Sequence, residues 1–190
     1  MRKSMIAAAS LMMVVGGVMS ARAERLMSDQ KAIKEMLPGA VTTDKVVKQA
    51  SAEDLAAIKK ELGGTLTANG HKEPDPKEFD FYIGMKDGKK TGVAVMEHQP
   101  GKWGMIGFAI GLDAATGKIT NMAVTTMNEK RGRPISLRSF LKQFFGKDSK
   151  APFEVGKDVD AVAGATISTN AAAFAAREAA VLYQHYYLSK

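Results

Sequence analysis

An alternation of apolar and polar side chains that begins at Phe79 constrains the fold of this chain more than any other feature. Phe79, Phe81 and Ile83 stand two residues apart. A period of two is the pattern of a β-strand with one buried face. Asp87-Gly88 then supplies a turn, and an apolar run follows at 93–96. These residues predict a β-hairpin.

A second hairpin is predicted further along the chain. Apolar residues recur over 105–112 and again over 119–124, and a turn sequence at 115–118 separates the two stretches. Glycine stands at 101, 104, 107 and 111, in and around the first of these strands. Glycine in a strand marks a turn, a bulge or a position that another group approaches closely, and these interpretations stay open here.

Four segments have the apolar spacing of helices. Ser51 can cap the second segment, whose first turn is acidic, and Gly63-Gly64 can end it. Thr169 or Asn170 can cap the last segment, which is rich in alanine. The four segments are residues 27–37, 52–62, 136–145 and 171–188.

Hairpins and helices together predict an α+β fold, with antiparallel β-hairpins packed against helices and a helix at the C-terminus. The chain of 190 residues shows no internal repeat. The proline-containing stretch at 71–77 is typical of a surface connection rather than of a domain boundary. We therefore expect residues 24–190 to form a single domain.

Residues 1–23 have the order of a secretory signal peptide. Basic residues come first, an apolar run follows at 5–19, and small residues precede the expected cleavage after Ala23. The apolar run is shorter than the roughly 20 residues that a membrane-spanning helix needs. The sequence thus predicts an exported, periplasmic protein, with an uncleaved N-terminal membrane anchor as the alternative.

Composition excludes several classes of chemistry. The chain has no cysteine, which excludes disulfides, thiolate ligands to zinc or iron–sulfur clusters and a cysteine nucleophile. Its three histidines lie far apart, without the spacing of metal ligands. Loss of the signal peptide lowers the formal charge from +7 to +4, because that segment carries three cations and no acid. The remaining basic residues are dispersed, so we expect no binding of nucleic acid.

Residues 160–169 form a hydroxyl-rich turn before the last predicted helix. A helix N-terminus presents unpaired N–H groups and the positive end of the dipole, which favour a phosphate. The dipole contributes only about 0.3–1 kcal/mol, so retention of a phosphate needs further contacts or a bond. The local sequence leaves two interpretations open: a phosphate site, or simple helix capping by Ser168, Thr169 and Asn170 with Gly164 in a turn.

The segment Asp160-Ala-Val-Ala-Gly164-Ala165-Thr166 resembles the flavinylation motif Asp-x-x-(Ser/Thr/Ala)-Gly-Ala-Thr of FMN-binding domains. This family includes the G subunit of Rnf-type complexes and the C subunit of sodium-pumping NADH:quinone reductases. The resemblance extends over about the last half of the chain, residues 79–190. It implies FMN bonded to Thr166 through a phosphoester, which a separate flavin transferase installs from FAD. It also implies that Asp160 assists the transferase or its metal and that Gly164 and Ala165 keep the loop accessible.

A second segment carries the same resemblance. Glu129 and Gly132 match a Glu-Thr-Pro-Gly type segment that lines the flavin site in this family, whereas Lys130 and Arg131 replace the threonine and the proline. The resemblance implies that Glu129 belongs to the flavin site. Lys130 and Arg131 either stabilise a reduced, anionic flavin or are solvated surface residues.

Trp103 and Ser168 complete the predicted site. Trp103 lies in a segment, Gly101 to Gly104, that resembles the glycine-aromatic entry strand of the family. It either covers a face of the flavin or is a half-buried core residue. The resemblance implies that Ser168 contacts the phosphate.

These features predict an exported electron-transfer flavoprotein. Covalent attachment suits an exported protein, because non-covalent retention would depend on the concentration of free FMN. The implied partners are the flavin transferase and a redox partner protein or membrane electron-transfer complex. Two alternatives stay open: a flavin-dependent oxidoreductase that acts on a small substrate, and a non-redox exported binding module.

Overall fold

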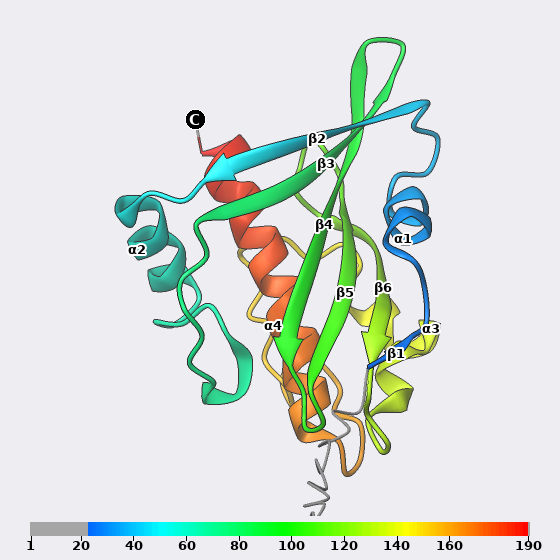
Figure 1. Cartoon of the computed structure of the whole chain (residues 1–190), viewed down its shortest axis with the longest axis vertical. Coiled ribbons are helices and arrows are strands. Elements are labelled where there is room, and N and C mark those ends of the chain that lie inside the picture. Colours follow the sequence, from blue (N-terminus) through cyan, green and yellow to red (C-terminus); the bar gives the residue numbers. More distant parts are fainter. Residues whose placement is uncertain (1–22, 190) are drawn as a thin grey trace, which may run out of the picture.

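The structure is a computed structural model that describes residues 23–189. The predicted signal peptide thus lies outside the described residues, apart from Ala23. Six antiparallel strands form one sheet in the order β1-β6-β5-β4-β3-β2 (Figure 1). The strands are β1 (Glu24–Arg25), β2 (Thr42–Gln49), β3 (Glu78–Lys86), β4 (Lys89–Pro100), β5 (Met105–Leu112) and β6 (Ile119–Met127).

Both predicted hairpins are confirmed. β3 pairs with β4 and β5 pairs with β6, each antiparallel. β4 also pairs with β5, from Val93 opposite Leu112 to Pro100 opposite Met105. The two hairpins are therefore consecutive parts of one meander, and the short β4–β5 turn at 101–104 joins them.

The sequence pattern does not predict the edge strand β2. It pairs with β3 from Thr42 opposite Met85 to Gln49 opposite Glu78. Most of its residues are exposed, so it has no buried face that would impose an alternation of apolar residues. Its charged side chains discourage pairing of this edge with another chain.

Four α-helices in the described part of the chain complete the α+β fold. The predicted start of α2 is confirmed, because Ser51 and Asp54 form a reciprocal capping box. Within residues 23–189, no helix combines the length and the apolar character needed to cross a membrane. The helical segments are α1 (Asp29–Met36), α2 (Ala52–Glu61), α3 (Arg138–Leu141) and α4 (Thr166–Tyr183), the 3-10 turns η1 (Ala68–Gly70), η2 (Arg133–Ser136) and η3 (Lys142–Phe144), and the π-helical turn η4 (Gln184–Leu188).

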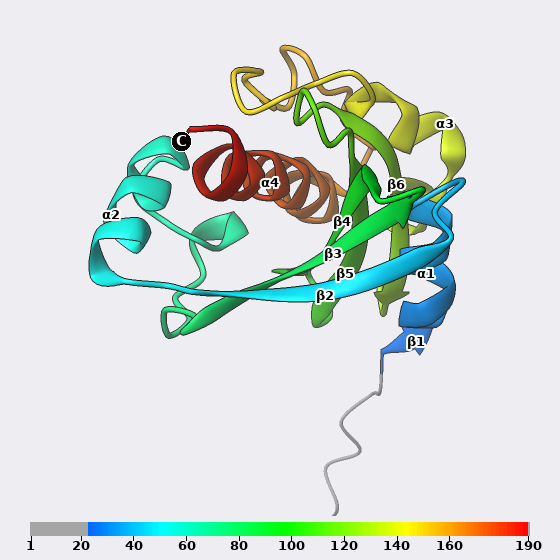
Figure 2. The same cartoon turned by 90° about the horizontal axis from the view of Figure 1, so that it is seen from above.

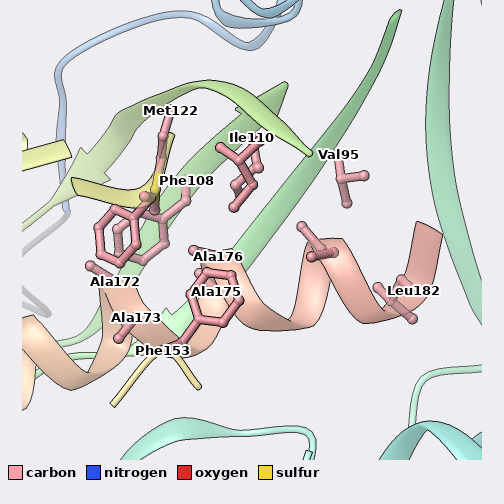
Figure 3. Packing of buried hydrophobic residues seen from close by; sticks show 14 of the residues in the cluster. Val95, Phe108, Ile110, Met122, Phe153, Ala172, Ala173, Ala175, Ala176 and Leu182 are labelled. Carbon is pink, nitrogen blue, oxygen red and sulfur yellow. The ribbon is translucent and has the colours of Figure 1, made fainter. Parts of the chain in front are cut away.

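The long helix α4 lies along one face of the sheet (Figure 2). Ala172, Ala175, Ala176 and Ala179 are fully buried in the main hydrophobic core. Because alanine side chains are short, α4 packs directly against strand residues such as Phe108 (Figure 3). This packing fixes the position of the N-terminal end of α4.

The short helix α1 covers the opposite face of the sheet (Figure 2). Ala32 and Met36 pack with Ala109 in a smaller core. A Cβ added to Gly111 would stand 2.7 Å from the carbonyl oxygen of Met36. The register of β5 and β6 also shifts at Gly107 and at Gly111. Glycine in these strands thus permits both the bulges and the close approach of α1 to the sheet.

The prediction of one helix over 136–145 is wrong. This segment consists of α3 between the two 3-10 turns η2 and η3. Leu137 has an extended backbone, and its N–H donates to the carbonyl of Pro134. Its side chain is 56% exposed rather than packed with Phe144, which is fully buried. Closure of the 3-10 turn at Leu137 therefore interrupts the helix and turns Leu137 outward.

Candidate functional site

Three segments that are distant in sequence meet at one end of the molecule, the lower end in Figure 1. They are the β4–β5 turn, the segment that follows β6, and the start of α4. Between them lies a cavity of about 520 Å³. Its lining residues are Lys102, Trp103, Glu129, Lys130, Arg131, Gly132, Gly164, Ala165, Thr166, Ile167 and Ser168.

Thr166 is the first residue of α4, so the helix begins well before the predicted start at Ala171. Its side chain is exposed and lines the cavity. The preceding residue, Ala165, occupies the N-cap position, and no side chain of the described residues caps the first turn. The N–H groups and the positive dipole end of α4 are therefore available to an anion beside the Thr166 hydroxyl.

Simple capping by Ser168, Thr169 and Asn170 is excluded, because all three lie inside α4. The Thr169 hydroxyl instead donates to the carbonyl of Ala165 at 3.0 Å and accepts from the N–H of Val162 at 3.2 Å. These bonds hold the turn before α4 against the first turn of the helix. Thr169 therefore fixes the loop that carries the predicted attachment site.

Gly164 supplies the backbone conformation of this turn. Its φ is +69°, in the left-handed region that favours glycine. The turn is closed by a hydrogen bond from the N–H of Ala165 to the carbonyl of Val162. A side chain at position 164 would strain the turn that presents Thr166.

Glu129 joins all three segments. Its side chain is only 4% exposed. One carboxylate oxygen accepts from the Ser168 hydroxyl at 2.6 Å, and the other accepts from the N–H of Trp103 at 3.0 Å. Because both donors depend on one buried carboxylate, Glu129 sets the distance between the β4–β5 turn and α4.

Glycine permits this close packing around Glu129. A Cβ added to Gly132 would lie 2.2 Å from the Ser168 Oγ, and one added to Gly101 would lie 2.6 Å from a carboxylate oxygen of Glu129. The match of Gly132 to the family segment thus has a steric basis in this fold.

Asn69 in η1 supports the site from outside the cavity. Its amide donates to the carbonyl of Pro100 at 2.9 Å and to the carbonyl of Ile167 at 3.1 Å. Its oxygen accepts from the amide of Asn170 at 3.3 Å. Asn69 therefore ties the end of β4 to the first turn of α4, a role that no sequence motif indicates.

Trp103 lies at the mouth of the cavity and is 52% exposed, which excludes a core role. Two ammonium groups lie over its ring, those of Lys102 at 5.7 Å and Lys130 at 5.5 Å from the centroid. Arg131 lines the same mouth and is exposed. The entrance is therefore cationic and aromatic.

The structure brings together six of the seven predicted flavin-site residues. Asp160 is the exception: it is exposed and does not line the cavity, and its N–H donates to the side chain of Gln143. Sequence reasoning did not place Lys102 or Ile167 in the site. Their proximity to Trp103 and Thr166 along the chain was the available signal. The six residues that share the cavity are Trp103, Glu129, Gly164, Ala165, Thr166 and Ser168.

A second cavity, of about 820 Å³, was not predicted. Glu97 of β4 and Glu178 of α4 both line it, and their carboxyl groups interact. Burial raises the pKa of Glu97 to about 8, and burial together with the Glu97 charge raises the pKa of Glu178. Gln99 donates to Glu178 at 2.6 Å. The available signal was a glutamate on the buried, alanine-rich face of the last helix.

Comparison with known proteins gives the class of this fold and site. Residues 101–181 match the model of the FMN-binding domain family, so this part of the chain is an FMN-binding domain. Every residue that lines the smaller cavity falls within that range. A comparison with curated proteins found no significant match.

Among solved structures, the fold is similar to that of NqrC from Shewanella oneidensis. The TM-score is 0.53 and the sequence identity is 19%, with 78% of this chain and 84% of that chain covered. At this identity the similarity concerns the fold, and it agrees with the predicted α+β class.

FMN is the cofactor that this family implies, and the smaller cavity suits it. FMN combines a phosphate with an aromatic ring system that becomes electron-rich on reduction. The uncapped first turn of α4 suits the phosphate, and Trp103 with its two lysines suits the ring. The residues present therefore fit the cofactor.

Proposed function

We propose that this protein is an exported electron-transfer flavoprotein that carries FMN on Thr166 through a phosphoester. The observation that carries the proposal is the position of Thr166. Its exposed hydroxyl stands at the uncapped N-terminus of α4 and at the edge of a cavity that lies wholly within the FMN-binding domain.

Attachment requires a separate flavin transferase, as the resemblance to flavinylated domains implies. The Thr166 oxygen replaces AMP on the FMN phosphate of FAD, and the hydroxyl proton is lost. Asp160 is exposed near the attachment loop but outside the cavity. That position suits assistance to the transferase or its metal rather than contact with the bound flavin.

The bound flavin supplies one- and two-electron transfer, and the chain supplies position and electrostatics. The first turn of α4 binds the phosphate, with Ser168 held beside it by Glu129. Lys102, Lys130 and Arg131 favour negative charge in the cavity. Trp103 limits access of water from the mouth.

Electron relay is favoured over turnover of a small substrate. The smaller cavity contains one acid, Glu129, among its lining residues, and both of its oxygens are engaged in fixed hydrogen bonds. The described lining thus holds no free carboxyl group that could donate a proton to a substrate. The redox partner is a protein or a membrane electron-transfer complex, and the predicted signal peptide supports a periplasmic location.

Denaturing gel electrophoresis of protein co-produced with a flavin transferase tests the attachment. The wild-type band is expected to fluoresce as flavin does, and the Thr166→Val band is expected to be dark. Asp160→Ala is expected to lose fluorescence as well, whereas Glu154→Ala, an exposed control in the segment before the loop, is expected to retain it. A fluorescent Thr166→Val band would contradict the site, and a dark wild-type band would favour the non-redox binding module.

A further inference from the structure

The mouth of the flavin cavity carries unneutralised positive charge. Lys102, Lys130 and Arg131, called here the cationic rim, are all exposed and all line the mouth. Within the described part of the chain, none of the three forms an ion pair. The one acid in the lining, Glu129, is buried beneath them. The rim therefore projects a positive field into solvent.

The cofactor does not require all of this charge. A phosphate in a phosphoester to Thr166 carries a single negative charge, and the first turn of α4 already faces it. While the flavin is oxidised, the three cations of the rim outnumber the two negative charges, that of the phosphate and that of the Glu129 carboxylate, so the mouth is positive. A surplus of one sign at the entrance to a redox centre attracts a partner of the opposite sign.

The lining that holds the rim also holds exposed apolar side chains. Trp103 is 52% exposed and Ile167 is 39% exposed, and they belong to different segments of the mouth. An apolar centre within a charged periphery is the arrangement of protein–protein interfaces. Surfaces of this kind support brief, weak encounters such as those of electron carriers.

We propose that the cationic rim is the docking surface for an acidic electron-transfer protein, whose carboxylates surround its own redox centre. The proposal rests on the flavin function proposed above and names the chemistry of the partner. Trp103 and Ile167 contact the apolar centre of that partner, and the rim steers it to the flavin mouth. An anionic membrane surface is the competing occupant.

Reoxidation of the reduced flavin by small oxidants of opposite charge tests the proposal. The probes are ferricyanide, an anion, and hexaammineruthenium(III), a cation, mixed with reduced protein under anaerobic stopped flow. For wild type, the second-order rate constant for ferricyanide is expected to fall as ionic strength rises from about 10 mM to about 0.5 M. The rate constant for the ruthenium complex is expected to rise over the same range.

The decisive variant is Lys102→Glu/Lys130→Glu/Arg131→Glu. At about 10 mM ionic strength, the ratio of the ferricyanide to the ruthenium rate constant is expected to fall about 100-fold or more, because the two rate constants move in opposite directions. A change in flavin potential alone would alter the driving force for both oxidants in the same direction. The ratio therefore separates steering from a redox effect.

The matched control is Lys86→Glu/Lys89→Glu/Lys90→Glu, which changes the net charge equally. These lysines lie at the β3–β4 turn, at the opposite end of the molecule from the mouth (Figure 1). The control ratio is expected to stay within about threefold of wild type, because screening removes most of the effect of distant charges. Equal ratios in both variants would overturn the proposal.

Four further outcomes also decide the question. Reduction of the oxidised wild-type flavin by a reduced, acidic plant-type ferredoxin, at a rate higher than in the rim variant and lowered by salt, supports the docking surface. If wild type sediments with phosphatidylglycerol vesicles and the rim variant does not, the rim binds a membrane surface. That result would overturn the proposed docking of a protein. A rim variant without flavin would assign the cations to cofactor binding, whereas a wild type without flavin would overturn both proposals.

Discussion

At the scale of single residues, Glu129 is the group on which the geometry of the flavin site depends most. It is buried, and it accepts hydrogen bonds from two segments, the β4–β5 turn and the start of α4. A buried carboxylate is tolerated when each of its oxygens accepts a hydrogen bond. Loss of the carboxylate or of a donor leaves a buried polar group without a partner.

Removal of this carboxylate is expected to destabilise the fold. Glu129→Ala leaves the Ser168 hydroxyl and the Trp103 N–H without their acceptor and is expected to lower the free energy of unfolding by about 2–3 kcal/mol. Glu129→Gln retains one acceptor oxygen, so we expect about half that loss. Urea unfolding of the flavin-free protein measures both values.

A double-mutant cycle identifies the contact that is responsible. Because Glu129 and Ser168 interact directly, their alanine variants are expected to be non-additive by about 0.5–1.5 kcal/mol. Strict additivity would show that the hydrogen bond contributes nothing to stability.

At the scale of elements, the buried alanines of α4 determine how closely the helix approaches the sheet. Ala176 is fully buried and packs among core residues. Ala176→Leu is expected to overpack the interface and to lower the free energy of unfolding by about 1–3 kcal/mol. Thermal and urea unfolding check this value. Ala57→Leu, at an exposed position of α2, serves as control and is expected to stay within about 0.5 kcal/mol of wild type.

The elements also show what the sequence could predict. The strands β3 to β6 carry alternating or continuous apolar residues between turn sequences, and α2 begins with a capping box, so these elements can be identified from the sequence. The sequence pattern does not predict β2, because this edge strand has no buried face. The sequence does not predict the start of α4, because the N-cap residue Ala165 makes no side-chain hydrogen bond. Ser168 and Thr169 are typical N-cap residues, but their hydroxyls bond elsewhere.

The same limit applies to the site. The motif that ends at Thr166 indicates the attachment residue, because those residues are adjacent in sequence. The bonds from Asn69 to Pro100 and Ile167 join segments far apart in sequence, and no local pattern encodes such contacts. The sequence does not predict the pair Glu97–Glu178 either, because these two residues are also far apart in sequence.

At the scale of the whole molecule, that carboxyl pair connects β4 to α4 and makes stability depend on pH. Burial raises the pKa of Glu97 to about 8 and raises that of Glu178, whereas both return to ordinary values near 4.5 on unfolding. The folded protein therefore binds more protons than the unfolded chain between about pH 4.5 and pH 8. The stabilising contribution is complete below that window and is lost as the pH rises through it.

We expect the free energy of unfolding to fall between pH 5 and pH 8. The slope is up to about 1.4 kcal/mol per pH unit for each extra proton that the folded protein binds relative to the unfolded chain. Glu178→Gln removes one of the two charges and keeps an acceptor for Gln99, so its profile is expected to be flatter. His71 and His98 line the same cavity, so the comparison is made between variants at each pH. Parallel profiles for Glu178→Gln, wild type and the control Glu73→Gln would contradict the role of the pair.

Intact mass spectrometry measures whether FMN is bonded to Thr166. Protein co-produced with a flavin transferase is denatured, weighed and digested. We expect a mass increase equal to FMN less one water, found on the peptide that contains Thr166 and absent from Thr166→Val. An unmodified chain, or the same increase on another residue, would contradict it.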